Sequence, residues 1–375
     1  MKLCIFPNDP LISYYNKGEI KNRYYNPCDL FNEIHVISFI EKDIEESKVK
    51  TLFGNAKYKI HCVGKINLKN RKKHIKKIID IVREIEPDVI RSYNTLIQGW
   101  FAAYCSQKLK IPFFLSLHTQ FDHNRALAKK NNLKKYFGLK YTEKFIEPYV
   151  LKHADEITIV YKIIEPYVLK HGGKKPQLLY NKVELERFQN ANNIKSLPKP
   201  LILSVGALIK EKNHQCIIES MKEINANCLI IGNGELYDEL TLLIKKNNLN
   251  DKITIKKTVP NNEIQDYYKS ASIFALAYDP ELEGLPIPVM EAMASGLPIV
   301  IPYPKTDFSE GLEETVMFSK RDSVSFTQKI NEILTNENLR TKLSNQSIKK
   351  SITYDGKNLE VKEAQIYKNL INRKL

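Results

Sequence analysis

Short apolar runs alternate along this chain with longer segments in which apolar residues recur every three or four positions. The clearest helical stripe lies within Leu68–Ile85, and Pro87 then ends the helix and opens a strand. Another helix is predicted over Thr95–Leu109. This alternation is typical of βαβ units, so it predicts a parallel sheet with helices on both faces. The strands predicted in the first half are Lys2–Phe6, His35–Phe39, Tyr58–Val63, Asp88–Ser92, Pro112–Leu117 and Glu156–Tyr161.

A polar stretch without periodicity, Gln189–Pro200, separates this series from a second one and is the predicted linker. The strands predicted after it are Leu201–Val205, Cys228–Ile231, Ile253–Lys256, Ser272–Leu276, Pro298–Ile301 and Thr315–Phe318. We therefore expect two Rossmann-like α/β domains, residues 1–190 and 198–375, facing a cleft at the carboxyl ends of their strands. The last helix is a candidate to pack back on the first domain.

The composition excludes several classes of protein. Of 375 residues, 43% are hydrophobic and 27% are charged, which is typical of a soluble globular protein. No apolar run approaches the roughly 18 residues that span a bilayer, and the first residues lack the apolar length of a secretory signal. The six cysteines contain no CxxC pair and the histidines no HExxH pattern. We therefore expect a reducing, cytoplasmic location, no disulfide scaffold and no metal site.

The positive charge is concentrated in the first half of the chain. The formal net charge is +15, and residues 1–187 contain 34 Lys and Arg against 20 Asp and Glu. An anionic partner is therefore expected to meet the first half. The alternative is that a lysine-rich composition places lysines on any exposed face.

The densest chemical signal lies in Glu281–Pro298, which we interpret as a strand end, a tight loop and a short helix. Gly284 permits an unusual backbone angle, and Pro286 suits a first helical turn. The free amides of residues 285–287 would then form an anion site. Glu283 and Glu291 suit hydrogen bonds from sugar hydroxyls beside a phosphate. The alternative is that Glu283 caps the helix and Glu291 is solvated.

The segment EGLPIPVMEAMASGLPIV, which contains Glu283 and Glu291, resembles the signature of family 4 retaining glycosyltransferases, which have the GT-B fold. Three more segments resemble motifs of this family in the same order. They are Asn181–Glu184, which resembles the end of the first domain, Leu203–Asn213, which resembles a strand with its phosphate-binding loop, and Leu229–Glu235, which resembles a strand with its Gly-rich turn.

The resemblance implies roles for individual residues. Lys212 would pair with the donor diphosphate, Glu283 would hold the donor sugar, and Glu291 would hold the ribose hydroxyls. His118 matches a histidine that lies near the transferred sugar. The catalytic residues implied are therefore Glu283, Lys212 and His118. The residues implied in donor binding are Glu291, Gly284, Leu285, Pro286, Ile287, Gly206, Lys210, Asn181, Gly232, Gly234 and Gly18.

Two positions depart from the family pattern. Ala207 stands where the family often has an arginine that binds the diphosphate, so Lys210 substitutes for it or Lys212 acts alone. Gly18 only loosely matches the family's glycine loop, because Glu19 occupies the position of the second glycine. The first departure leaves open a weakly active or inactive relative.

The function that these features imply is transfer of a sugar from a nucleoside diphosphate sugar to a glycan, glycolipid or polysaccharide precursor, with retention at the anomeric carbon. The resemblance implies neither a metal nor another cofactor. The alternatives are a nucleotide-sugar 2-epimerase of the same fold and a degenerate glycosyltransferase that acts as a binding partner. No nucleic-acid-binding module is recognisable.

Two basic stretches suggest a further partner. Lys65–Lys77 contains seven basic residues and no acid, and Lys129–Lys144 interleaves lysines with apolar residues. The second stretch resembles a basic amphipathic segment that lies on an anionic bilayer. We therefore expect peripheral association of residues 126–145 with the inner face of the membrane. The alternative is a solvated, lysine-rich face.

Overall fold

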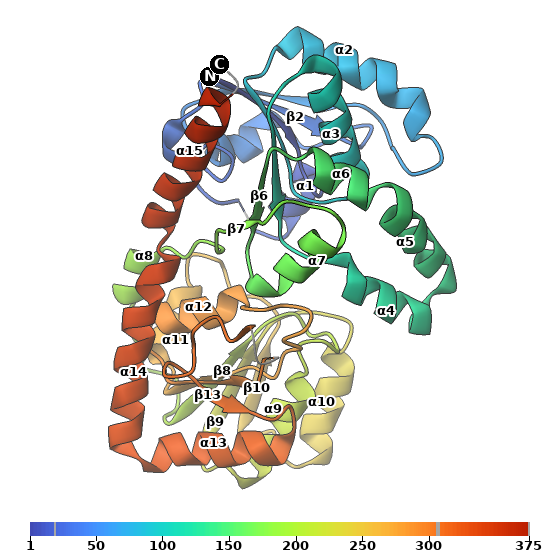
Figure 1. The fold of residues 1–375 in the computed structure, drawn as a ribbon. Coiled ribbons are helices and arrows are strands. Elements are labelled where there is room, and N and C mark those ends of the chain that lie inside the picture. The colour runs from blue at the N-terminus through green and yellow to red at the C-terminus, as the bar shows by residue number, and fades with distance from the viewer. Residues whose placement is uncertain (19, 305–307, 374–375) are drawn as a thin grey trace. The chain divides into compact units, whose positions relative to one another are not determined.

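The computed structural model describes residues 1–18, 20–304 and 308–373 and divides the chain into two compact units. The first unit comprises Met1–Tyr180 and the residues from Asn358 onward, and the second comprises Asn181–Lys357. Each unit is built around its own parallel sheet with helices on both faces (Figure 1). The predicted α/β class with two parallel-sheet domains is therefore confirmed.

In its described residues, the first unit contains a seven-stranded sheet in the order β3-β2-β1-β4-β5-β6-β7. All pairings are parallel, and the register is set at the centre, where Leu3 of β1 lies between Ile34 and Val89. The chain reverses its direction of winding between β1 and β4, which is the ligand-binding point of doubly wound sheets. The strands are β1 (Lys2–Phe6), β2 (Glu33–Ser38), β3 (Lys57–Cys62), β4 (Val89–Ser92), β5 (Phe113–Leu117), β6 (Glu156–Ile159) and β7 (Gln177–Leu178).

Helices cover both faces of this sheet. The C-terminal helix α15 buries Leu359, Ile366 and Tyr367 in the same core as Leu3 and Phe114, while α2 and α3 contact β1. Helix α2 turns Ile78, Val82 and Ile85 inward, as its apolar stripe predicts. The helices of this unit are α1 (Leu11–Asn16), α2 (Ile75–Ile85), α3 (Ile97–Leu109), α4 (Phe121–Asn131), α5 (Leu133–Phe145), α6 (Glu147–His153), α7 (Glu165–Lys170) and α15 (Gly356–Asn372).

The second unit repeats the same strand order on a shorter chain. Its described sheet has six parallel strands in the order β10-β9-β8-β11-β12-β13, so the winding reverses between β8 and β11. Short, nearly continuous apolar strands such as Leu201–Val205 are buried on both faces, as parallel sheets require. The strands are β8 (Leu201–Val205), β9 (Asn227–Ile231), β10 (Ile253–Lys256), β11 (Ile273–Ala275), β12 (Ile299–Pro302) and β13 (Met317–Ser319).

The main core of this unit joins one face of the sheet to α9, α10 and α13 through residues such as Ile230, Ile217 and Phe326. The helices are α8 (Leu185–Gln189), α9 (His214–Ser220), α10 (Tyr237–Lys246), α11 (Ile264–Ser270), α12 (Ile287–Ala294), α13 (Ser323–Thr335) and α14 (Glu337–Ser351). Among the helices described in either unit, none has both the length and the hydrophobicity that crossing a membrane requires.

The polar stretch predicted as a linker lies inside the second unit. Asn192 donates its backbone N–H to Asp266 Oδ1 at 2.9 Å, and Ile194 donates its N–H to Ser270 Oγ at 2.6 Å. Both acceptors lie on α11, and Ser270 is its last residue. The stretch is thus hydrogen-bonded to a helix far ahead in the sequence, which its composition does not reveal. The division between the units falls instead between Tyr180 and Asn181.

A buried charge fixes α15 to the sheet of the first unit. The guanidinium of Arg91, on β4, forms an ion pair with Glu363 and donates a 2.7 Å hydrogen bond to the hydroxyl of Tyr367. The side chains of Arg91 and Glu363 are only 5% and 3% exposed. The same guanidinium lies 4.8 Å from the ring centroid of Phe114 on the neighbouring strand. Helix α15 therefore supplies the counter-charge that this buried arginine requires.

We expect Glu363→Gln to destabilise the protein by about 3–5 kcal/mol, because it leaves the Arg91 guanidinium buried without a counter-charge. Urea unfolding followed by circular dichroism measures this change. The matched control is Glu332→Gln, whose carboxylate pairs with Lys329 on the surface at 3.0 Å, and it should alter stability by less than about 0.5 kcal/mol. Equal unfolding midpoints for the two variants would contradict the assignment of α15 as an ion-paired element of the first unit.

Candidate functional site

The predicted donor-site residues of the second unit gather where its winding reverses. The loop after β8 contributes Lys212, and the loop after β11 contributes Glu283. These loops leave adjacent strands at their carboxyl ends, which is where ligands bind in open α/β sheets. The two side chains form an ion pair between Lys212 Nζ and Glu283 Oε2, and they are 13% and 31% exposed. The structure therefore brings together two residues that lie far apart in the sequence.

The loop after β8 packs directly on the loop after β9, backbone against backbone. A Cβ atom on Gly232 would lie 1.8 Å from the carbonyl oxygen of Gly206, and one on Gly234 would lie 2.5 Å from that of Leu208. Gly206 donates its N–H to Ile231 at 3.0 Å. Gly232 and Gly234 are thus required by a close approach of the backbone, so their first role is to position the loop of Lys212.

Arg321, which follows β13, ties this loop to the neighbouring strand. Its Nε donates a 2.8 Å hydrogen bond to the carbonyl of Ala277, just after β11. Its Nη2 donates to the carbonyls of Glu211 at 2.9 Å and Lys210 at 3.3 Å. The Glu211 carbonyl also accepts the backbone N–H of Asp279 at 2.9 Å. One guanidinium therefore connects the loops that carry Lys212 and Glu283.

Helix α12 begins four residues after Glu283. The helix runs from Ile287 to Ala294, with Pro286 at the N-cap and Pro288 in the first turn. Pro286 therefore lies one residue before the first turn in which it was predicted, and Pro288 occupies that turn. Because proline has no N–H, only Leu285 and Ile287 can supply the amides predicted for residues 285–287. Gly284, Leu285 and Pro286 are buried, and the Gly284 carbonyl accepts the hydroxyl of the buried Tyr278 at 3.1 Å. In the described residues no side chain caps this N-terminus, so its dipole is available to an anion.

Glu291 lies on the same helix and is half-buried. Its Oε2 accepts a 2.9 Å hydrogen bond from the hydroxyl of Tyr268 on α11. Tyr268 is fully buried between Phe274 and Phe188, whose ring centroids lie at 5.8 Å and 5.6 Å. Burial, followed by the nearby Glu291 carboxylate, raises the pKa of Tyr268 well above its usual value. The phenol therefore stays protonated and orients the carboxylate.

His118 follows β5 in the first unit, as predicted. Its ring lies 5.8 Å from that of Tyr93, which follows β4, so it also lies at the carboxyl edge of its sheet. Burial, and then the Arg91 guanidinium, lower the pKa of His118 to about 4. The imidazole is thus neutral near neutral pH and can donate one hydrogen bond and accept another without carrying charge.

The remaining predicted residues lie as follows. Lys210 and Ala207 are exposed on the loop after β8, and Asn181 is half-buried at the start of the second unit. Gly18 is exposed, has φ +68° and donates its N–H to Tyr15 at 3.0 Å, so it closes the end of α1. Glu19 lies outside the described residues.

Sequence reasoning missed Arg321, Tyr268 and Asp279. Arg321 and Asp279 act on backbone carbonyls through tertiary contacts, which leave no local pattern. Tyr268 lies four residues into α11, and its relation to Glu291 depends on the packing of two helices. The hydroxyl of a fully buried tyrosine needs a partner, which was the one available signal.

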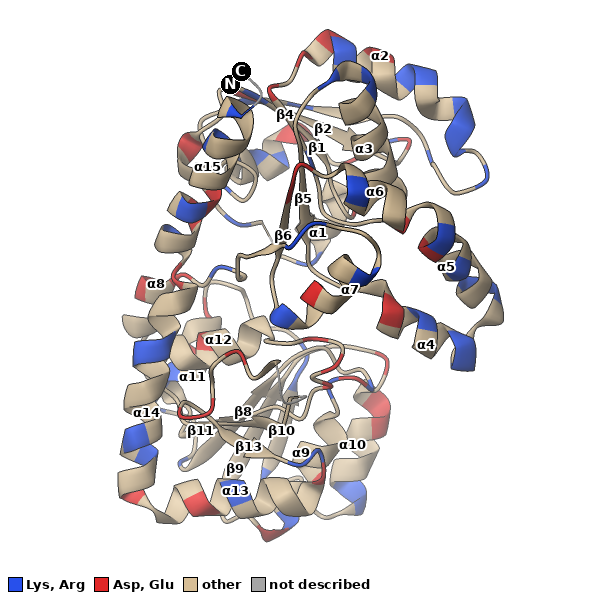
Figure 2. Ribbon diagram, in the orientation of Figure 1, with Lys and Arg blue, Asp and Glu red and all other residues tan. Residues whose placement is uncertain are grey.

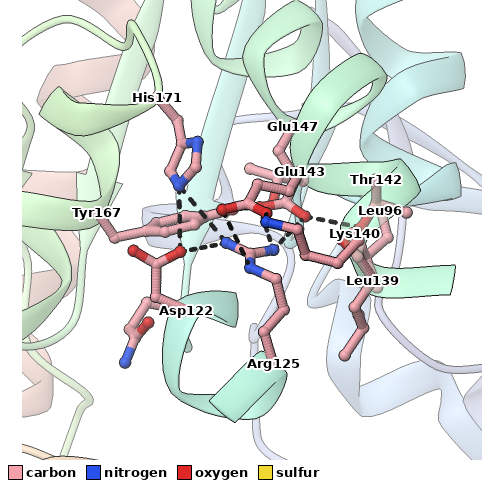
Figure 3. A network of polar contacts seen from close by, with 12 residues as sticks. Leu96, Asp122, Arg125, Leu139, Lys140, Thr142, Glu143, Glu147, Tyr167 and His171 are labelled. Atoms are coloured by element: carbon pink, nitrogen blue, oxygen red, sulfur yellow. Dashed lines mark hydrogen bonds and ion pairs between the residues drawn. The ribbon is translucent and has the colours of Figure 1, made fainter. Parts of the chain in front are cut away.

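One group of potential metal ligands occurs in the described part of the chain, in the first unit. It consists of Asp122, Glu143 and His171, whose ligand atoms lie within 4.8 Å of one another. Figure 3 shows that the Arg125 guanidinium lies among these side chains, and it pairs with both acids. Hydrogen bonds from Lys170 and Arg125 outweigh burial and lower the pKa of Asp122 to about 2. An arginine thus already supplies the positive charge of this cluster.

We expect Arg321→Gln to loosen the loop that carries Lys212, because three hydrogen bonds to carbonyls are lost or weakened. The free energy of local opening should fall by about 1–3 kcal/mol, so amide hydrogen exchange over residues 208–212 should accelerate roughly 5- to 150-fold. Mass spectrometry of peptides from this loop measures the rate. Lys320→Gln, at the neighbouring exposed position, is the control. Unchanged exchange in the Arg321 variant would show that the loop is held by other contacts.

Comparison with known proteins matches part of the chain to a family and the whole chain to solved folds. Residues 186–350 match the family described as glycosyl transferases group 1. An uncharacterized glycosyltransferase of Methanocaldococcus jannaschii is 27% identical over 263 residues, covering 68% of each chain. An N-acetylgalactosaminyltransferase of Campylobacter jejuni that acts on a diphospho-undecaprenol-linked sugar is 30% identical over 181 residues, covering 48% of this chain and 47% of its own.

The fold is that of solved GT-B proteins. The crystal structure of HepE from Anabaena in complex with UDP has a TM-score of 0.75 at 12% identity, covering 98% of this chain and 100% of its own. The same protein in complex with UDP-glucose has a TM-score of 0.71 at 13% identity, with the same coverage. Residues 186–350 thus match the group 1 glycosyltransferases, and the chain as a whole has the GT-B fold.

Proposed function

We propose that this glycosyltransferase moves a sugar from a nucleoside diphosphate sugar to a glycan, glycolipid or polysaccharide precursor, with retention at the anomeric carbon. The observation that carries the proposal is the ion pair of Lys212 and Glu283, which lies at the reversal point of the second sheet, four residues before α12 begins. A cation and the positive end of a helix dipole suit a diphosphate, while an adjacent carboxylate suits sugar hydroxyls. The relative HepE was solved with UDP-glucose, which supports a donor of this class.

Lys212 and α12 supply the charge complementarity for the leaving group. The Lys212 ammonium is neutralised by Glu283. A bound diphosphate would form an ion pair with the Lys212 ammonium. The Glu283 carboxylate would then accept hydrogen bonds from hydroxyls of the donor sugar. Negative charge develops on the diphosphate as its bond to the anomeric carbon breaks, and fixed positive charge stabilises that state most strongly.

The reaction needs no protein nucleophile. The bond between the anomeric carbon and the diphosphate oxygen breaks, and the acceptor hydroxyl oxygen forms a new bond to the same carbon from the same face. The proton of that hydroxyl passes to an oxygen of the departing phosphate. The protein positions the reactants and stabilises charge, so electrostatic preorganisation is the main catalytic contribution.

Glu291 would hold the ribose hydroxyls of the donor. Tyr268 donates to one of its carboxylate oxygens, so the carboxylate is oriented before the donor binds. His118, on the first unit, is proposed to hydrogen-bond to the transferred sugar. Since its pKa is about 4, it would do so as a neutral imidazole.

Ala207 occupies the position at which many family members have an arginine that binds the diphosphate. Arg321 does not replace it, since its guanidinium already donates to three backbone carbonyls. Lys210 is an exposed cation on the same loop. We therefore assign the main diphosphate contact to Lys212, with Lys210 as its supplement.

We place the acceptor at an anionic membrane surface that residues 126–145 approach. The lipid-linked substrates or products named for two relatives support this location. One acts on a diphospho-undecaprenol-linked sugar, and an alpha-monoglucosyldiacylglycerol synthase of Streptococcus pneumoniae is 21% identical over 267 residues. Lysine-rich, partly apolar segments associate reversibly with such surfaces.

The experiment that tests the proposal is a screen of nucleotide sugars by thermal shift, followed by product analysis of each donor that stabilises the protein. Transfer or hydrolysis of the sugar supports the proposal. Isomerisation of the donor at its second carbon would assign a 2-epimerase instead, and donor binding without turnover would assign a binding partner.

We expect Lys212→Ala and Glu291→Ala each to lower the rate of transfer by about 10²–10³-fold, because each removes a charged contact at the donor. Steady-state kinetics with the donor identified by the screen measures the loss. Lys222→Ala, an exposed position of the same unit, is the control, and thermal unfolding verifies that each variant folds. Wild-type turnover in both site variants would refute the assigned donor site.

We also expect activity to survive EDTA. The proposed site neutralises the diphosphate with Lys212 and α12, and the one cluster of potential ligands in the described residues already contains Arg125. The measurement is transfer after dialysis against chelator, compared with the same sample after addition of Mg²⁺ or Mn²⁺. Activity that disappears with EDTA and returns with either ion would contradict the expectation.

A further inference from the structure

Helix α5 exposes a continuous apolar stripe on the first unit. The stripe consists of residues spaced four apart, which follow one face of the helix: Leu133, Phe137, Tyr141 and Phe145, exposed by 61%, 67%, 40% and 52%. The opposite side of the helix is buried through Leu139 and Thr142. An aromatic stripe so exposed is unusual on a soluble surface and marks an interaction site.

Lysines flank this α5 stripe. Lys134, Lys140 and Lys144 are exposed on the same helix, and Lys144 Nζ lies 5.3 Å from the ring centroid of Phe145. The first unit as a whole contains 36 Lys and Arg against 20 Asp and Glu, whereas the second contains 22 against 23. Figure 2 shows blue segments repeated along α4, α5 and the approach to α2. The surface of the stripe is thus apolar at its centre and basic at its edges.

The structure joins the two basic stretches of the sequence at this stripe. Arg71, from the first stretch, donates a hydrogen bond from Nη2 to the hydroxyl of Tyr141 at 2.8 Å. Its guanidinium carbon lies 5.6 Å from the ring centroid of Tyr141 and 5.5 Å from that of Trp100. Trp100 stacks on Tyr104 at 5.3 Å and lies 6.4 Å from Tyr149. We call Trp100, Tyr104 and Tyr149 the aromatic row.

A buried ion network holds α5 in this orientation (Figure 3). Arg125 of α4 is 5% exposed and donates to both oxygens of Glu147, at 2.8 Å and 3.0 Å. Thr142 of α5 donates a 2.7 Å hydrogen bond to Glu147, and Tyr167 of α7 donates one of 2.6 Å. Glu147 is fully buried. The network therefore connects α4, α5, α6 and α7 and keeps Leu139 inward and the stripe outward.

We propose that the α5 stripe, Arg71 and the aromatic row form one surface that docks on an anionic lipid bilayer. This proposal rests on the membrane location in the proposed function and names the surface that makes the contact. The exposed α5 stripe enters the interfacial region with the half-buried aromatic row beside it, and the lysines and arginines pair with lipid phosphates. With 13 residues, α5 is about 20 Å long and lies along the surface. Apolar insertion beside basic side chains selects a bilayer over a soluble polyanion, which offers no apolar phase.

The first test measures binding to vesicles of phosphatidylcholine with and without phosphatidylglycerol, at low and high salt. We expect binding to the anionic vesicles only, weakened by salt. Leu133→Ser with Phe137→Ser should weaken binding more than tenfold. Lys134→Gln with Lys144→Gln should weaken it about fivefold per charge. All four positions are exposed, so the fold should be unaffected.

Matched controls come from the second unit. Leu242→Ser with Val324→Ser removes two apolar side chains that are 65% and 67% exposed, and Lys245→Gln with Lys246→Gln removes two exposed lysines from α10. Both controls should bind as the wild type does. A control that loses as much affinity as its counterpart would overturn the proposal.

The second test uses the chain's single tryptophan, which is Trp100. We expect its fluorescence to shift to the blue on binding to anionic vesicles and to be quenched by lipids brominated on their acyl chains. Binding without quenching would mean that another surface faces the bilayer and would overturn the proposal. Equal affinity for a soluble polyanion, unaffected by the Leu133 and Phe137 changes, would also overturn it and would identify a surface that recognises charge alone.

These outcomes are independent of sugar transfer. Thermal stabilisation by a nucleotide sugar without vesicles reports on the donor site of the second unit. Vesicle binding with no donor turnover would refute the proposed activity and support the proposed docking surface. Donor turnover with no vesicle binding would refute the proposed docking surface and support the proposed activity.

Discussion

The close contact between the loops after β8 and β9 is the constraint on which the donor site depends. The Gly206 carbonyl occupies the space where any side chain at position 232 would begin, at 1.8 Å from an ideal Cβ. Arg321 donates to the carbonyls of Lys210 and Glu211 on the loop after β8 and connects them to Ala277. That connection in turn aligns Lys212 with Glu283. The chemistry of the site is therefore a consequence of backbone packing at a reversal point of the sheet.

The two units use charge in different ways. The second unit has nearly equal numbers of basic and acidic residues, so its affinity for an anion must come from local arrangement: one lysine, one helix N-terminus and the carboxylates beside them. The first unit has a large basic excess, most of it on the surface. Its buried cations, Arg91 and Arg125, are each neutralised by a buried glutamate. The excess that remains exposed can act at a distance on an anionic surface.

The alternation of apolar strands and helical stripes was sufficient to predict both sheets, because parallel strands are buried on both faces and have few alternatives. Two short strands at sheet edges show the limit. β7 has two residues and was not predicted, and β13 was predicted two residues early. Such strands carry too few residues for a period to appear. The polar stretch predicted as a linker failed for a different reason, since its partners on α11 lie more than 70 positions away.

The donor site was predictable only through a motif, because periodicity says nothing about residues 71 positions apart. The resemblance pointed to Lys212, Glu283 and Glu291, and the structure pairs the first two and orients the third through Tyr268. It could not point to Arg321, whose partners are backbone carbonyls that any sequence provides. The sequence also indicates a single amphipathic element over the basic segment 126–145. It consists of the end of α4 and the whole of α5, separated at Asn132, whose side chain accepts the Lys135 N–H at 2.9 Å and caps α5.

The ion network behind α5 is best understood together with the stripe in front of it. Removing the charges of Arg125 and Glu147 from water is unfavourable, and a well-packed apolar cluster would stabilise the same four helices at least as well. A network of directional hydrogen bonds differs from an apolar cluster in fixing the rotation of each helix about its axis. Rotation of α5 by half a turn would bury Phe137 and expose Leu139, with little change in total apolar burial. The directional bond from Thr142 to Glu147 at 2.7 Å excludes that alternative. An exposed aromatic stripe that is held outward by a buried and costly polar network is the arrangement expected of a docking surface.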